Sequence, residues 1–137
     1  MTWDAGNGEM LHVINHATSV SGYEWNRRGL AVPYELGVAQ AFSRPTVAVD
    51  PDGYHMWFSY RSGKSSQKYK IGCAHSSLGE NCELRLADAG IDISESGWNS
   101  EMIEYLFVFN HKGQRFMLYN RNGYERTVFG LAALESC

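Results

Sequence analysis

Gly53-Tyr-His-Met-Trp-Phe-Ser-Tyr-Arg61-Ser-Gly63 occurs twice in this chain, the second time as Gly113-Gln-Arg-Phe-Met-Leu-Tyr-Asn-Arg121-Asn-Gly123. In each copy an apolar run lies between a glycine and an arginine, and the two copies begin 60 residues apart. Two shorter matches extend the repeat: Ile71–Ala74 with Phe129–Ala132, and Ala17–Gly22 with Ala74–Gly79. A repeating unit of roughly 40 to 60 residues built from short strands is typical of a β-propeller blade.

The length and composition of the chain indicate one folded domain. Its 137 residues are 44% hydrophobic and 13% aromatic, which is enough for a packed core. The net charge of −3 argues against a nucleic-acid partner. Apolar runs are shorter than the roughly 20 residues that cross a bilayer, and the polar start does not resemble a signal peptide. We therefore expect a cytoplasmic protein with no membrane partner.

The cysteines and histidines show no spacing typical of a metal site or a disulfide framework. The cysteines are Cys73, Cys82 and Cys137, and at least two of them are expected to be packed thiols. The histidines His55, His75 and His111 fall at scattered turns and strand ends. From the sequence we therefore expect no metal and no cofactor.

Short aromatic and β-branched runs bounded by turn-forming residues recur along the chain, which predicts an all-β fold of antiparallel strands. The clusters Asp50–Gly53 and Asn110–Gly113 should each close a hairpin, with the glycine supplying a positive φ. We expect about nine strands, at residues 10–17, 24–31, 43–50, 53–61, 68–76, 82–86, 102–110, 113–120 and 127–135.

These strands group into a partial β-propeller of about two to two and a half four-stranded blades. Residues 1–137 form one module, in which 10–31 supplies the third and fourth strands of one blade, 43–86 a complete blade and 102–135 the first three strands of the next. A propeller closes a ring of about four to eight blades. Because bare sheet edges promote association, we expect the chain to complete its ring as a homodimer or homotrimer.

Several segments resemble, in order, the C-terminal half of the five-bladed propeller proteins related to glycoside hydrolase families 43 and 32. Those segments are Ser43–Val47, Gly53–Tyr60, Tyr69–Ala74, Gly97–Met102 and Asn122–Ala132. Ser19–Arg27 is also similar to an outer strand pair of the same proteins. The resemblance covers residues of about 10 to 135, and it implies family members about twice as long as this chain.

The resemblance implies a site in the central funnel, where carboxylic acids project from the inner strands. Glycoside hydrolysis needs one acid that protonates the leaving oxygen and a second carboxylate that acts as base or nucleophile. By motif, Glu101 in Ser100-Glu101-Met102 is the candidate general acid, and Arg44, at the equivalent place one blade earlier, is the candidate sugar-binding guanidinium. Trp98 and Glu104 are further candidate substrate-binding residues. The catalytic aspartate of the family's first blade has no counterpart.

Each of these residues also has a purely structural interpretation. Glu101 and Glu104 are both explained as charged residues at a strand entrance. Arg44 precedes Pro45, which should hold it in an extended conformation, where it can pair with a carboxylate at the edge of the core. Aromatic side chains contribute most of the apolar burial between blades, which explains Trp25, Trp57 and Trp98.

Two functions follow as alternatives. The first, which we favour from the sequence, is a carbohydrate-binding or structural propeller module without complete catalytic machinery in one chain. The second is a glycoside hydrolase that is active only as an assembled homo-oligomer, with Glu101 as general acid. Retaining and inverting chemistry need carboxyl groups about 5–5.5 Å or 6.5–9.5 Å apart, and in a symmetric assembly such a spacing would be a coincidence.

Overall fold

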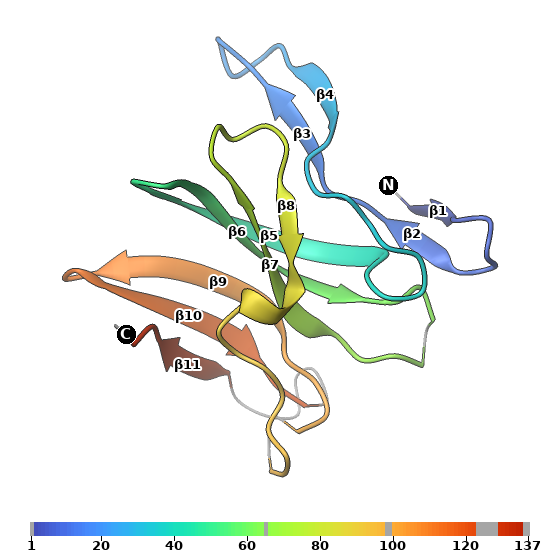
Figure 1. The fold of residues 1–137 in the computed structure, drawn as a ribbon, viewed down its shortest axis with the longest axis vertical. Coiled ribbons are helices and arrows are strands. Elements are labelled where there is room, and N and C mark those ends of the chain that lie inside the picture. Colours follow the sequence, from blue (N-terminus) through green and yellow to red (C-terminus); the bar gives the residue numbers. More distant parts are fainter. Residues whose placement is uncertain (1, 65, 98–99, 123–128, 136–137) are drawn as a thin grey trace.

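The computed structural model describes residues 2–64, 66–97, 100–122 and 129–135, and this part of the chain is all-β (Figure 1). One short 3-10 helix, η1 (Leu86–Asp88), interrupts the strands. No helix among these residues is long and apolar enough to span a membrane. The all-β prediction is confirmed. The strands are β1 (Thr2–Asp4), β2 (Met10–His12), β3 (Asn15–Thr18), β4 (Asn26–Leu30), β5 (Ala41–Asp50), β6 (Gly53–Arg61), β7 (Lys70–Ser76), β8 (Glu83–Arg85), β9 (Glu104–His111), β10 (Gln114–Asn120) and β11 (Gly130–Ala133).

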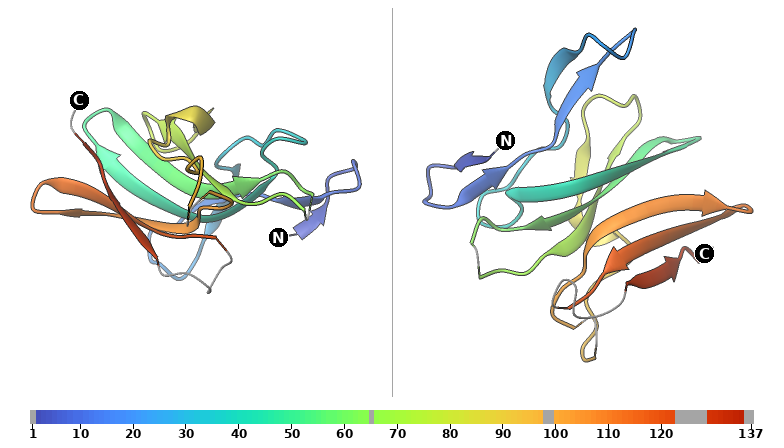
Figure 2. Two further views of the ribbon diagram at one scale, coloured as in Figure 1. Left: turned by 90° about the horizontal axis from the view of Figure 1, so that it is seen from below. Right: turned by 180° about the vertical axis from the view of Figure 1, so that it is seen from behind.

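The strands form three sheets. A six-stranded sheet has the order β1-β2-β5-β6-β7-β8, a three-stranded sheet the order β11-β10-β9, and β3 pairs with β4 alone. Strands β5 to β8 are an antiparallel meander, as are β9 to β11. Strand β9 packs against β5 and β6, so the two meanders lie beside each other (Figures 1 and 2). Figure 2 also shows the strong twist of the larger sheet.

The predicted strand at residues 10–17 is wrong, because it is two strands that belong to different sheets. Strand β2 pairs in parallel with β5 through His12 and Ala41, whereas β3 pairs antiparallel with β4. Val13 and Ile14, between them, lie in no strand. The sequence of residues 10–17 hides this change of sheet, because the pattern of apolar and polar residues along a strand does not report which neighbour the strand pairs with. Strand β1 was not predicted.

The repeat at Ala17–Gly22 and Ala74–Gly79 corresponds to one turn built twice. In the first copy the Gly22 amide donates a hydrogen bond to Ser19 Oγ at 2.8 Å, and in the second the Gly79 amide donates to Ser76 Oγ at 3.0 Å. Each turn follows one strand and leads toward the next, from β3 to β4 and from β7 to β8. The match therefore reflects side-chain chemistry that closes a turn.

The two copies of the longer repeat match in the structure with a shift of one residue relative to their match in the sequence. The alignment places Phe58 opposite Leu118 of the second copy, but the ladders pair Phe58 with Gly72 and Tyr119 with Gly130, which makes Phe58 and Tyr119 equivalent. The two hairpin turns cause the shift: Asp50 pairs with Gly53 in the first, whereas His111 pairs with Gln114 in the second. Gly113 therefore lies within its turn, and Gly53 begins its strand.

The buried core has two parts. One lies between the two meanders and joins β7 to β9 and β10, and the other lies between β5–β7 and the connection at residues 31–40. Of the expected packed thiols, Cys73 is buried and Cys82 half-buried, both as free cysteines, and Cys137 lies outside the described residues. The members of the first part are Ile71, Cys73, Ala89, Ile103, Leu106, Val108, Met117 and Tyr119; those of the second are Ala31, Val32, Ala39, Phe42, Phe58 and Ala74.

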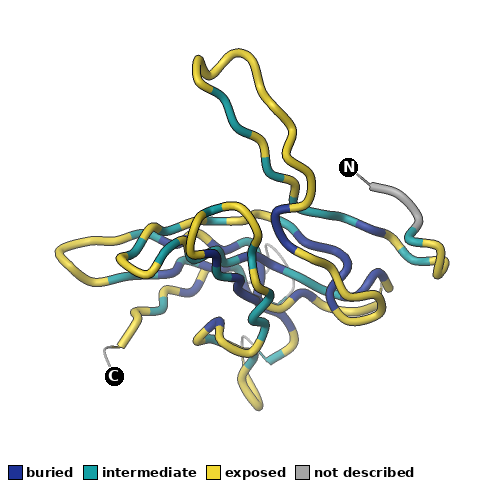
Figure 3. Tube along the Cα trace, turned by 45° about the horizontal axis from the view of Figure 1, so that its top comes forward, coloured by how far each residue is buried: buried dark blue, intermediate teal, exposed yellow. Residues whose placement is uncertain are grey.

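The β3–β4 hairpin projects from this body and is exposed along most of its length (Figure 3). Large apolar side chains near its tip face solvent, and Val20, Tyr23 and Trp25 are 106%, 92% and 61% exposed. Trp25 is tied to the turn by a hydrogen bond from its indole nitrogen to the Gly22 carbonyl, at 3.2 Å. Among the described residues Trp25 belongs to neither part of the buried core, whereas the half-buried Trp57 packs against the first part.

Candidate binding site

Two β-bulges place the candidate site at the point where β5 and β9 lie side by side. In the β5–β6 ladder, Arg44 and Pro45 together face one residue of β6, and in the β9–β10 ladder Tyr105 and Leu106 together face Tyr119. The φ angles of Arg44 and Tyr105 are 48° and 51°, in the left-handed region. The expectation that Pro45 holds Arg44 extended is therefore wrong, since the bulge overrides the local preference. Such strained residues often mark functional sites.

The two bulged residues contact each other. The Arg44 guanidinium carbon lies 4.8 Å from the centroid of the Tyr105 ring, within the range of a cation–π interaction. A second pair lies next to it, in which the Arg61 guanidinium is 5.2 Å from the Tyr69 ring centroid. The Tyr69 and Tyr105 rings are 6.2 Å apart, so two guanidinium groups flank two phenol rings. We call these four residues the Arg–Tyr cluster.

Glu104, next to Tyr105, is fully buried. Neither of its carboxylate oxygens has a hydrogen-bond partner among the described residues. Burial raises the pKa of Glu104 to about 7, although the positive charges of Arg44, Arg61 and Lys68 act in the opposite direction. A buried carboxyl group with no partner is costly to a folded chain, so Glu104 needs a donor that these residues do not supply.

Further buried polar atoms lack partners in the described part of the chain. They are Ser43 Oγ, Arg61 Nε, His12 Nε2 and Glu9 Oε2. Ser43 precedes Arg44 and occupies in the first bulge the position that Glu104 occupies in the second. The charge of Arg61 acts on Glu104. An unpartnered hydroxyl group and an unpartnered donor therefore belong to the same site as the Glu104 carboxyl group.

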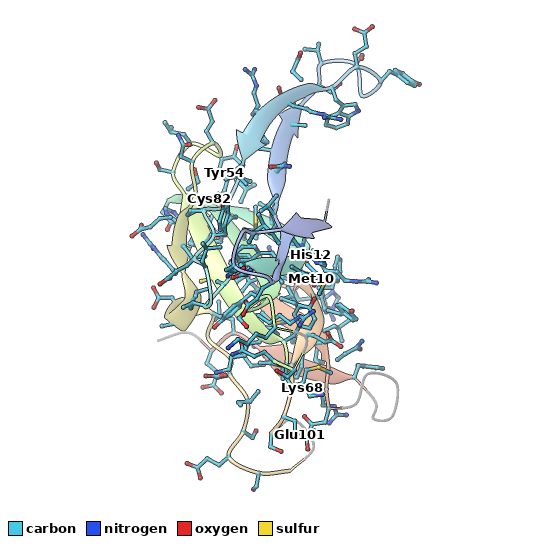
Figure 4. All side chains as sticks on the ribbon, turned by 90° about the vertical axis from the view of Figure 1, so that its right-hand side faces the viewer. Met10, His12, Tyr54, Lys68, Cys82 and Glu101 are labelled. Carbon is cyan, nitrogen blue, oxygen red and sulfur yellow. The ribbon has the colours of Figure 1, made fainter. Side chains whose placement is uncertain are left out.

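Of the residues predicted from the sequence, the structure brings Arg44 and Glu104 together and leaves Glu101 apart. Glu101 is exposed and precedes β9, and its backbone amide donates to Asn122 Oδ1 at 2.9 Å. Its side chain lines a neighbouring pocket of about 400 Å³ with Arg61 and Lys68. Figure 4 shows Glu101 and Lys68 toward the same end of the molecule. Trp98 lies outside the described residues. The predicted equivalence of Glu101 and Arg44 is wrong, because the ladders make Tyr105 the counterpart of Arg44.

The sequence analysis missed Tyr105, Tyr69, Arg61 and Ser43 as members of the candidate site. The repeat gave no signal for the bulges, because Ser43-Arg44-Pro45 and Glu104-Tyr105-Leu106 share no residue type. The apolar cavity of about 340 Å³ between the two meanders is a different place, lined by Trp57, Ile91, Val108 and Met117, and it contains no member of the Arg–Tyr cluster.

No protein-family model matches the chain. The chain is similar to two curated proteins of Mycobacterium tuberculosis, Uncharacterized protein MT1551 and Uncharacterized protein Rv1502, and is 43% identical to each over 135 residues. The aligned region covers 98% of this chain but 44% of each relative. The chain therefore spans less than half the length of the curated relatives that it matches.

Proposed function

We propose that this chain is a carbohydrate-binding module of a glycosidase-like β-propeller, and that the Arg–Tyr cluster and Glu104 form its binding site. The observation that carries the proposal is the buried, unpartnered Glu104 carboxyl group beside the Arg44–Tyr105 pair. A sugar supplies hydroxyl groups that both donate and accept hydrogen bonds, and its C–H faces pack on aromatic rings. It therefore matches the unpartnered acceptors of Glu104 and Ser43, the unpartnered donor of Arg61 and the phenol rings. Because these polar atoms are buried, a sugar reaches them only when the side chains that cover them move aside.

The propeller interpretation is part of this proposal. A four-stranded meander followed by a second meander of three strands fits one blade and most of another. In that arrangement β5 and β9 are inner strands, and the bulges at Arg44 and Tyr105 aim their side chains toward the ring axis. The resemblance to propeller proteins related to glycoside hydrolase families 43 and 32 implies the same location for a sugar.

Glycoside hydrolysis is the second candidate function, and the raised pKa of Glu104 favours it. A general acid must hold its proton near neutral pH, and a carboxyl group with a pKa of about 7 does so. Glu101 is exposed and has no such environment, so Glu104 takes the acid role in this alternative. The second carboxylate would come from another propeller segment, in an assembly or in a longer chain.

The binding test compares Glu104→Gln, Arg44→Gln and Glu101→Gln with the unchanged protein. Binding is first detected on a microarray of mono- and oligosaccharides and is then measured for the bound sugar by titration calorimetry. We expect Glu104→Gln and Arg44→Gln to weaken binding at least about tenfold, the equivalent of 1.4 kcal/mol. Glu101→Gln is the matched control, because it removes an exposed carboxylate three residues before Glu104 and should change the affinity less than about threefold.

The same variants test hydrolysis with a panel of 4-nitrophenyl glycosides. If the unchanged protein releases 4-nitrophenol, Glu104→Gln should abolish the release, whereas Glu101→Gln should retain it. Absence of both binding and release would reject the proposed function. Binding that survives in Glu104→Gln and Arg44→Gln would place the sugar elsewhere on the chain.

We also propose that the module completes its ring with a second or third copy of itself. The free sheet edges at β8 and β11 and the exposed apolar tip of the β3–β4 hairpin support this. Light scattering at micromolar concentration should therefore report a dimer or trimer. Replacing Val20, Tyr23 and Trp25 together by serine should shift the mass toward the monomer without lowering the stability of each chain. A well-folded monomer at every concentration would contradict the closed-ring model.

A further inference from the structure

A second group of side chains, outside the proposed sugar site, gathers at the β5–β6 hairpin. His55 of β6 and His75 of β7 are directly opposite each other in the ladder, and their ring centroids are 4.7 Å apart. Asp52, in the turn between β5 and β6, reaches both imidazoles. Its Oδ1 lies 2.9 Å from His55 Nε2, and its Oδ2 lies 3.6 Å from His75 Nε2. The sequence analysis treated these histidines as scattered, because it did not predict their pairing across the ladder.

We propose that Asp52, His55 and His75 form a binding site for a divalent transition-metal ion, best suited to Zn²⁺. Two imidazole nitrogens and one carboxylate are a common ligand set for this ion. Their candidate ligand atoms all lie within 4.8 Å of one another. Three protein ligands leave a fourth coordination position for water or a small ligand. This inference does not rest on the proposed sugar binding.

Binding of one ion would draw the three ligand atoms slightly together. Zn²⁺ bonds of about 2.0–2.1 Å place neighbouring ligand atoms roughly 3.3 Å apart in a tetrahedron, and the candidate atoms lie within 4.8 Å of one another. Asp52 faces His55 with Oδ1, at 2.9 Å, and His75 with Oδ2, at 3.6 Å, so one oxygen has to turn toward both imidazoles. The Asp52 side chain has room to turn, since 65% of it is accessible to solvent. The same exposure gives an ion a direct path of entry.

The surroundings hold His55 in place without competing for the ion. The Trp57 ring lies nearly parallel to the imidazole, at 6.0 Å between centroids. Asp50 Oδ2 is 3.7 Å from His55 Nε2, but both Asp50 oxygens accept hydrogen bonds from Arg115, each at 2.7 Å. Arg115 therefore balances the charge of Asp50, and Asp52 is the carboxylate available to the ion.

The experiment uses the full chain without a histidine tag, treated with EDTA and then dialysed. Titration calorimetry with Zn²⁺ should give one bound ion per chain, and Co²⁺ should give the visible absorption of a tetrahedral complex. His75→Gln and Asp52→Asn should each lower the Zn²⁺ affinity at least about tenfold. His16→Gln is the control, because it removes a histidine of β3 that lies outside the group, and it should leave the affinity unchanged.

Circular dichroism checks the fold of each variant. Asp52 lies in an exposed turn, so Asp52→Asn keeps the test valid even if His75→Gln fails to fold. Failure of the unchanged protein to bind Zn²⁺ at submillimolar concentration would overturn the proposal and leave a hydrogen-bonded group of side chains. Binding that is equally strong in Asp52→Asn and His75→Gln would also overturn it, because the ion would then lie elsewhere.

Discussion

Replacing Glu104 by glutamine is expected to make the protein more stable above neutral pH. In the folded chain the pKa of Glu104 is raised by burial to about 7, from an ordinary value of 4.5. The stabilising contribution of this protonated carboxyl group is fully present below the unfolded pKa and is lost as the pH rises through the folded one. At 1.36 kcal/mol for each pH unit, the loss is on the order of 3 kcal/mol. Glutamine does not ionise, so Glu104→Gln does not lose this stability as the pH rises.

The measurement is urea unfolding of both proteins at pH 5, 6, 7 and 8.5. The difference in unfolding free energy should grow with pH and level off above pH 7, in favour of Glu104→Gln. Other titrating groups appear equally in both proteins and cancel in the difference. Folding lowers the pKa values of Asp50 and His12. These two groups therefore make both proteins less stable as the pH falls, whereas Glu104 makes the unchanged protein less stable as the pH rises.

Glu101→Gln is the matched control for this experiment. It removes an exposed carboxylate three residues earlier in the chain, so the comparison tests whether the effect depends on the burial of Glu104. Parallel curves for Glu104→Gln and the unchanged protein would show that Glu104 ionises in the folded state as it does in water. The carboxyl group would then have a partner in solution, and the argument for an open binding site would fail.

A residue that weakens its own fold at neutral pH calls for a functional explanation. Most buried polar atoms in proteins are satisfied, yet Glu104, Ser43 and Arg61 all keep open atoms in one place within the described residues. A sugar, or a further propeller segment that covers the site, would satisfy them and recover the stability. Proteins commonly trade stability for function in this way. The pH experiment therefore tests the physical basis of the proposed site before any sugar is known.

Much of the strand arrangement is predictable from the sequence, because turns and alternation are local properties. The strand at 53–61 is predicted to the residue, and β5, β9 and β10 are displaced by at most two residues at either end. The serine–glycine turns were visible as a repeat for the same reason, since one hydrogen bond fixes both residues of each turn. Turn residues and alternation along the chain therefore predict the positions of most strands.

The candidate site was predicted less well, because it depends on two bulges. Side chains alternate between faces along a strand, and one extra residue reverses the faces of everything beyond it. Nothing in Ser43-Arg44-Pro45 shows that two residues there face one residue of β6. The motif comparison therefore selected Glu101, which lies before the strand, and gave the buried Glu104 a secondary role.

Gly53→Ala is expected to destabilise the fold by about 3 kcal/mol or more, because two costs combine. The φ angle of Gly53 is 128°, a conformation that residues with a side chain rarely adopt. An added Cβ would also lie 2.5 Å from the Ser76 carbonyl oxygen and 2.7 Å from Ser77 Cα, both of them backbone atoms of the neighbouring strand and its turn. Relief therefore requires a shift of the β6–β7 pairing.

Gly113→Ala separates these two costs. Gly113 also has a positive φ, 79°, as the turn prediction required, but a Cβ there would meet no atom within 4 Å. Its expected cost is about 1 kcal/mol, from backbone conformation alone. Urea unfolding of both variants gives the comparison. Equal losses of unfolding free energy in the two variants would show that β7 does not approach Gly53 as closely as the β6–β7 ladder requires. The equivalence of Phe58 and Tyr119 depends on the same ladder and would then lose its support.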